Sequence, residues 1–91
     1  MKGVFKMKQF SYTITDPEGI HARPAGEFVK AAKGFESKVT IAKDGKSVDA
    51  KKIFGVMGLG VKQGHTIDVT VEGPDEDTAA PALEEFLKNN L

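Results

Sequence analysis

One histidine of the chain, His21, stands where a side chain could do covalent chemistry. It lies inside the segment from Gly19 to Ala25, between a turn and an expected helix. The first backbone N–H groups of a helix have no intrahelical partner, so a helix start attracts anions. A neutral imidazole is nucleophilic near neutral pH, and its attack on a phosphoryl group gives a phosphoramidate that passes the group on. The segment therefore fits the transient carriage of a phosphoryl group.

Arg23 follows two positions after His21 and can fold toward the same point. Its guanidinium offers a fork of donors that matches phosphate oxygens. Such a charge-assisted bond contributes about 1.5–3 kcal/mol, and a helix dipole about 0.3–1 kcal/mol, which holds a phosphate without trapping it. The same spacing also fits a histidine that merely stands near a helix start beside a solvated arginine. The segment alone leaves both interpretations open.

Other residues with chemical potential are sparse. His65 begins an alternating segment, which favours a surface histidine with a structural role or none. The chain has no cysteine, which excludes disulfides, thiolate zinc sites and a thiol nucleophile. No carboxylate pair, metal-ligand cluster or Ser–His–Asp set emerges, so we expect neither a metal nor a cofactor. Asp16 and Glu18 lie near His21, and whether they orient its imidazole is open.

Charge and hydropathy exclude several classes of protein. The 91 residues are enough for one small domain, and 13 basic residues balance 13 acidic ones. This balance argues against nucleic-acid binding, which needs a basic excess or stripe. No apolar run approaches the roughly 20 residues of a membrane span. The first ten residues carry positive charge without the apolar stretch of a signal peptide. We expect a cytoplasmic protein that does not insert into a membrane.

The segments on either side of His21 predict a strand and a helix. Residues 8–15 alternate, with apolar side chains on one face, and residues 16–19 break the strand with a proline and a glycine. Residues 22–33 repeat apolar side chains at helical spacing, and Pro24 suits a first turn, where its missing N–H costs nothing. The expected core side chains here are Phe10, Tyr12, Ile14, Ala25, Phe28, Val29 and Ala32.

Shorter elements follow. Residues 38–41 and 46–49 predict two strands joined by a hairpin that contains Asp44-Gly45. The glycine-rich apolar stretch 53–60 predicts one or two helical turns, and residues 65–72 predict a strand with alternate side chains buried. The resulting order β-α-β-β-α-β-α predicts an α+β fold, an open-faced sandwich with helices on one face of an antiparallel sheet.

The last expected helix carries a proline. Leu83, Phe86 and Leu87 form its apolar stripe. Pro81 cannot donate to the carbonyl four residues earlier and disfavours helical geometry at Ala80. We therefore expect this helix to begin late or to be irregular before Ala82.

The segment Gly19-Ile20-His21-Ala22-Arg23-Pro24-Ala25 resembles the phosphorylation-site signature of HPr, the histidine-containing phosphocarrier family of the bacterial phosphoenolpyruvate-dependent sugar phosphotransferase system. The likeness extends from about Met7 to Leu91 and includes FVKAAKGF (28–35), DGK (44–46) and KIFGVMGLG (52–60). It implies a four-stranded antiparallel sheet of order 1-4-2-3, covered on one face by three helices. It also implies a phosphocarrier domain over residues 7–91, preceded by an extension at residues 1–6, since Met7 would make a more typical initiator.

The resemblance implies roles at the phosphate site. His21 would accept a phosphoryl group on Nδ1 from phosphorylated enzyme I and pass it to a sugar-specific enzyme IIA. Arg23 would be the phosphate-site partner, and Pro24 would shape the helix entry. The chain would be a carrier within a relay and not a turnover enzyme, and we expect a monomer.

The family also implies a docking surface. Ile53, Phe54 and Met57 correspond to an apolar surface beside the active histidine. From the residues alone they would be partly core, although the adjacent glycines disfavour a fully buried helix. Lys30 and Lys33 could form a basic rim that attracts acidic partners.

Lys52 departs from the family pattern. In many members a serine at this position opens the short second helix and is phosphorylated by a regulatory kinase. Ser47 is a poor substitute because it falls on an expected strand, so we expect no regulatory serine phosphate. The alternative function is a regulatory docking protein, for example in a nitrogen-related branch of the system. The intact His21 and Arg23 argue against a role in docking alone.

Overall fold

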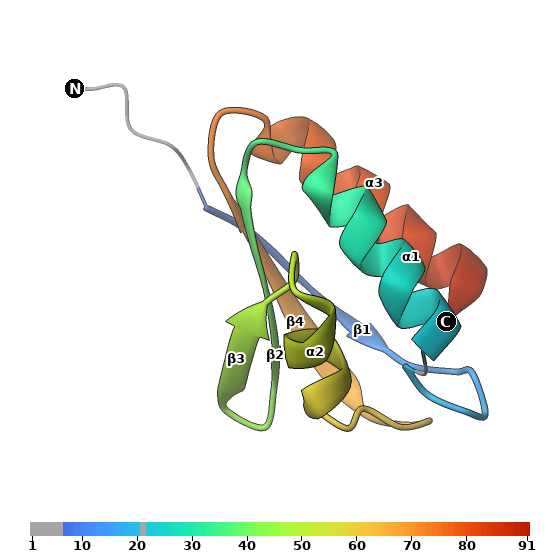
Figure 1. Cartoon of the computed structure of the whole chain (residues 1–91). Helices are drawn as coiled ribbons and strands as arrows, with labels where there is room; N and C mark the ends of the chain where they lie inside the picture. The colour runs from blue at the N-terminus through green and yellow to red at the C-terminus, as the bar shows by residue number, and fades with distance from the viewer. Residues whose placement is uncertain (1–6, 21) are drawn as a thin grey trace.

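A computed structural model describes residues 7–20 and 22–91 and shows one antiparallel sheet with helices on one face (Figure 1). The four strands follow the order β1-β4-β2-β3. Their bounds are Met7–Thr13 for β1, Lys38–Lys43 for β2, Lys46–Asp49 for β3 and Thr66–Glu72 for β4. The helices are α1 (Ala22–Lys33), α2 (Ile53–Gly58) and α3 (Glu76–Asn90). The predicted fold class, element order and strand order are confirmed.

The core lies between the sheet and the pair α1 and α3, which run side by side over it (Figure 1). The central strand β4 pairs with β1 and with β2, so that Val69 lies opposite both Phe10 and Ile41. Strand side chains alternate between faces, and every second residue of β4 is therefore fully buried. The predicted inward faces of the first and last strands are confirmed.

The predicted helical stripes also lie in this core. The four apolar residues expected for α1, from Ala25 to Ala32, are buried against the sheet. Phe28 meets Phe86 of α3 with ring centroids 5.8 Å apart in a tilted arrangement. Leu83 and Leu87 are fully buried, and Phe86 packs at the edge of the core.

The expectation of a late or irregular last helix was wrong. The helix α3 begins at Glu76 and contains Pro81. The Asp75 carbonyl accepts hydrogen bonds from the N–H groups of Thr78 and Ala79, at 3.0 and 2.9 Å, and so anchors the first turn. The Pro81 ring is exposed, whereas Ala79 and Ala80 before it are buried. The turn's packing and its own hydrogen bonds thus offset the single backbone bond that the proline removes.

None of the helices among the described residues is long and apolar enough to cross a membrane.

Candidate functional site

His21 lies outside the described residues, so the site is built from the segments on either side of it. The preceding loop is held close to another loop of the chain. The Ile20 N–H donates to the Val61 carbonyl at 3.0 Å, and Gly19 has a positive φ of 68°. A Cβ on Gly19 would lie 2.3 Å from the Val61 oxygen. Only glycine permits both this backbone angle and this approach, which directs the chain into α1.

The last residue fixes the other side of the same loop. The Leu91 carbonyl accepts hydrogen bonds from the backbone N–H groups of Thr15 and Asp16, at 2.6 and 2.9 Å. It also accepts from the Thr15 hydroxyl at 2.9 Å. The Asp16 carboxylate accepts from the Glu18 N–H at 2.8 Å, which closes a local turn. Backbone acceptors from two remote segments therefore position the chain that enters α1.

Arg23 and Pro24 lie in the first turn of α1 and line a small pocket. Pro24 is buried and Arg23 is exposed. The pocket has a volume of about 280 Å³, and its remaining lining residues are Asp16, Glu27 and Asn90. A guanidinium in an open pocket at a helix start can bind phosphate oxygens. The predicted pair is thus at the start of the helix that follows His21.

Sequence analysis missed Glu27 and Asn90. Glu27 follows Arg23 by one helical turn, a spacing that brings side chains onto the same helix face and could have identified it. Asn90 comes from the far end of the chain, so only the packing of α3 beside α1 brings it here. No group of three His, Asp or Glu side chains able to hold a metal ion occurs in the part of the chain that the structure describes.

The helix α2 divides its apolar side chains between core and solvent. Val56 is fully buried, whereas Phe54 is 88% exposed and Met57 39% exposed. Ile53 is half-buried and faces α1, since a Cβ on Gly26 would lie 3.6 Å from its Cδ1 atom. Lys43 holds the end of the helix, and its Nζ donates to the Leu59 and Gly60 carbonyls at 3.2 and 3.3 Å. The predicted docking residues therefore lie together on α2, with Ile53 against α1.

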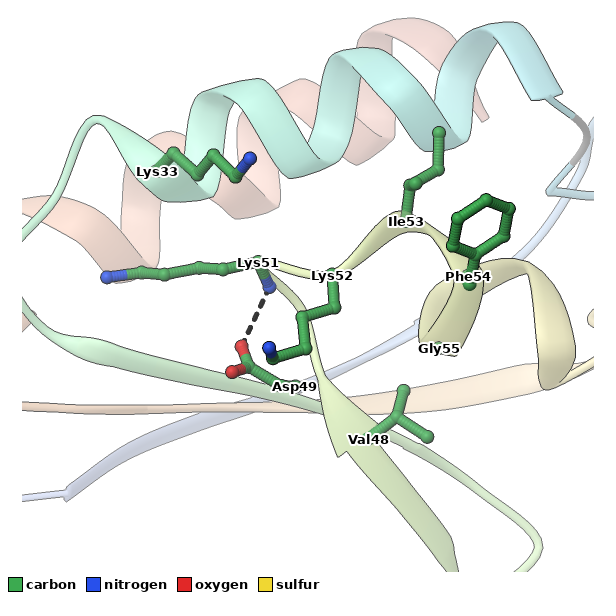
Figure 2. Close-up of a pocket in the computed structure, with 8 residues that line it drawn as sticks. All are labelled: Lys33, Val48, Asp49, Lys51, Lys52, Ile53, Phe54 and Gly55. Carbon is green, nitrogen blue, oxygen red and sulfur yellow. Dashed lines mark hydrogen bonds between the residues drawn. The ribbon is translucent and has the colours of Figure 1, made fainter.

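The two lysines predicted to form a basic rim lie near the end of α1. Lys30 and Lys33 are both exposed in its last turn. Lys33 lines an open recess of about 880 Å³ that also contains Lys52 and Phe54 (Figure 2). Lys52 is exposed, and its side chain makes no capping bond to α2. Ser47 lies on β3, as expected.

The second histidine has a structural position. The His65 Nδ1 atom accepts a hydrogen bond from the Lys62 N–H at 3.0 Å. Its backbone N–H donates to the Lys62 carbonyl at 3.0 Å, and its own carbonyl accepts from the Ile14 N–H at 2.9 Å. His65 therefore closes the turn before β4.

An anionic network lies at the opposite end of α1. The Asp75 carboxylate accepts hydrogen bonds from the Ser37 hydroxyl and from the N–H groups of Glu36 and Ser37, the latter two at 2.8 and 2.9 Å. The Ser37 hydroxyl contributes most to lowering the pKa of Asp75, and the Glu36 N–H follows. Ser37 is fully buried, and its bond to Asp75 joins the loop after α1 to the segment before α3.

Comparison with known proteins agrees with this architecture. Residues 8–89 match the family model for the PTS HPr component phosphorylation site. The chain is 46% identical over 81 residues to phosphocarrier protein HPr of Lysinibacillus sphaericus, covering 89% of this chain and 92% of that relative. Each described helix and strand lies wholly or largely within the matched range.

Solved structures show the same fold. The HPr of Bacillus anthracis superposes with a TM-score of 0.84 at 40% identity, covering 89% of this chain and 96% of that one. An HPr dimer from Thermoanaerobacter tengcongensis gives 0.73 at 41% identity, covering 90% and 94%. A family model over most of the chain, close relatives and a shared topology lead to one conclusion: the chain belongs to the HPr family of phosphocarrier proteins of the phosphotransferase system.

Proposed function

We propose that the chain relays phosphoryl groups through His21, accepting them from phosphorylated enzyme I and passing them to a sugar-specific enzyme IIA. The observation that carries this proposal is the exposed Arg23 beside the buried Pro24 in the first turn after His21. The imidazole Nδ1 attacks phosphorus, the bond from phosphorus to the donor breaks, and the guanidinium stabilises the charge on the transferred oxygens. The reverse exchange at enzyme IIA regenerates the free imidazole, so the chain is a carrier and not a turnover enzyme.

The test is labelling with enzyme I and radioactive phosphoenolpyruvate. We expect an acid-labile phosphate on the wild-type chain and none on His21→Ala. His65→Asn is the matched control, because an asparagine oxygen can replace the acceptor that His65 offers to the Lys62 N–H. Labelling of His21→Ala at the wild-type level would contradict the proposal. An unlabelled wild-type chain that still binds its partners would instead indicate the regulatory docking protein.

We propose that partners dock on Ile53, Phe54 and Met57, with Lys30 and Lys33 as the basic rim. The exposure of Phe54 and the contact of Ile53 with α1 support this assignment. Phe54→Ala removes an exposed aromatic side chain from the proposed interface. We expect the KM of enzyme I for this chain to rise by about tenfold or more. The melting temperature should stay close to that of the wild type because the ring is 88% exposed. An unchanged KM would exclude Phe54 from the interface.

We propose that the chain escapes the regulatory kinase of the family because Lys52 occupies the position of the modified serine. Purified HPr kinase should leave the protein unmodified, and phosphate on Ser47 would show this mapping to be wrong. We also propose a cytoplasmic monomer. Sedimentation analysis is the test of the oligomeric state, since three similar solved structures are described as dimers.

A further inference from the structure

Glu27 shares a pocket with Arg23, and the proposed phosphoryl relay gives Glu27 no role. The two residues line the same space of about 280 Å³, together with Asp16, Pro24 and Asn90. They are four positions apart in α1, a spacing that brings Cβ atoms to about 5–6 Å on one helix face. Both side chains are exposed, so each can turn toward the other. The pocket therefore combines one guanidinium with two carboxylates.

The two carboxylates of this pocket are engaged differently. The Asp16 Oδ1 atom accepts a hydrogen bond from the Glu18 N–H at 2.8 Å, which ties this carboxylate to the turn before α1. The carboxylate of Glu27 forms no hydrogen bond or ion pair in the part of the chain that the structure describes, and the same holds for the guanidinium of Arg23. Glu27 is therefore able to follow the Arg23 guanidinium, whereas Asp16 is held by its own turn.

We infer that the Glu27 carboxylate competes with the transferred phosphoryl group for Arg23, and that this competition keeps the phosphoryl group easy to release. The inference rests on the proposed function, which places the phosphoryl group on His21, two residues before Arg23. The guanidinium binds either the carboxylate of its own helix or the phosphoryl oxygens. Glu27 is a positioning residue, because it acts through Arg23 and not on the reacting atoms.

The size of this effect follows from the exposure of both charges. In water, a unit charge about 6 Å away changes the affinity for an anion about threefold per unit of charge. A protein-bound phosphoryl group carries about 1.5–2 negative charges near neutral pH, so Glu27 should weaken its attraction to the site about threefold to tenfold. Salt at about 1 M reduces the screening length to about 3 Å and should remove most of this difference.

The first experiment titrates the unphosphorylated chain with inorganic phosphate and follows the Nε–H signal of Arg23 by NMR. We expect Glu27→Gln to bind phosphate about threefold to tenfold more tightly than the wild type at low salt. Glu27→Asp keeps the charge and should stay close to the wild type. Glu85→Gln is the matched control, because it removes an exposed carboxylate of α3 outside the pocket. An equal response of the wild type and Glu27→Gln, including no response in either, would overturn the inference.

The second experiment measures the equilibrium of transfer from phosphorylated enzyme I. In this step phosphorus bonds to Nδ1 of His21, and the donor atom of enzyme I keeps the electron pair of the broken bond. We expect Glu27→Gln to shift the equilibrium toward the phosphorylated chain about threefold to tenfold. Normal labelling of His21 with an unshifted equilibrium would overturn this inference and leave the proposed function standing. A wild-type chain without label, together with tighter phosphate binding by Glu27→Gln, would overturn the proposed function and support the competition for Arg23.

Discussion

The two ends of α1 are held by different kinds of bond. At the start, the loop of residues 15–20 is fixed mainly by backbone carbonyls, those of Val61 and Leu91. At the far end, the loop after α1 is fixed by the Asp75 carboxylate, which accepts from Glu36 and Ser37. In the facing segment between β4 and α3, the Glu76 carboxylate accepts from the Gly73 N–H at 3.0 Å. Each end also contains a glycine in close contact with a neighbouring segment, Gly19 with Val61 and Gly73 with Ser37.

The hydrogen bonds at the two ends of α1 should respond differently to pH. The Val61 carbonyl does not titrate, whereas the Asp75 carboxylate accepts its hydrogen bonds most strongly when it is ionised, which lowers the pKa of Asp75. At the end proposed to carry phosphate, the carboxylate contact is that of Asp16 with the Glu18 N–H, whereas the Asp75 carboxylate accepts three hydrogen bonds at the opposite end of the helix. Substitutions at the two ends should differ in how strongly their effects depend on pH.

The largest effect should come from Gly19→Ala, which changes the loop that leads into α1. Its Cβ would lie 2.3 Å from the Val61 oxygen at a φ of 68°. Backbone strain and overpacking together should lower the free energy of unfolding by about 3–5 kcal/mol. Denaturant titration measures this loss. Gly45→Ala is the control, because Gly45 has a φ of 81° and nothing within 4 Å of its Cβ position. If Gly19→Ala loses no more stability than Gly45→Ala, the close approach of Gly19 to the Val61 oxygen does not matter.

A smaller, pH-dependent effect should follow from Asp75→Asn at the other end. The variant loses the anionic acceptor of the buried Ser37 hydroxyl, so its melting temperature at neutral pH should fall. Because folding lowers the pKa of Asp75, the carboxylate stabilises fully above its ordinary value of 3.8 and less as pH falls through the lower folded-state pKa. The difference in melting temperature between the wild type and Asp75→Asn should therefore become smaller in acid.

Thermal unfolding across a pH series measures this difference. Asp77→Asn is the matched control on the same turn, because its ion pair with Lys8, at 3.1 Å, is exposed and contributes little. If the difference in melting temperature between the wild type and Asp75→Asn stays constant down to about pH 3, the Asp75 network does not depend on an ionised carboxylate.

The smallest effect should come from Thr15→Val, which keeps the shape of the side chain and removes its bond to the Leu91 carbonyl. We expect a loss of about 0.5–1.5 kcal/mol in the free energy of unfolding. A stability equal to that of the wild type would show that this hydrogen bond contributes nothing to holding the loop.

The sequence predicted the elements well because each has a clear hydrophobic period. Residues 22–33 and 65–72 bury the side chains that their periods indicate. Pro81 misled the prediction, since the local rule does not include the packing of Ala79 and Ala80. In the apolar stretch 53–60, composition could not tell the buried Val56 from the exposed Phe54, because only the sheet beneath α2 decides which face is covered.

The site was predicted less completely than the fold. His21, Arg23 and Pro24 are neighbours in sequence and could be read together. Glu27 and Asn90 join Arg23 only through helix geometry and the packing of α3. The hydrogen bond from Ser37 to Asp75 spans 38 positions, and no local sequence pattern predicts it.

The bonds to the Leu91 carbonyl also affect how the chain folds as it is synthesised. Thr15 and Leu91 are 76 positions apart, so this contact is among the least local that the chain can make. Contacts of such separation close late, after the helices and hairpins have formed. A nascent chain that ends before residue 91 lacks the acceptor that holds the loop leading into α1. We therefore expect that loop to reach its final geometry on the ribosome only after residue 91 has been translated.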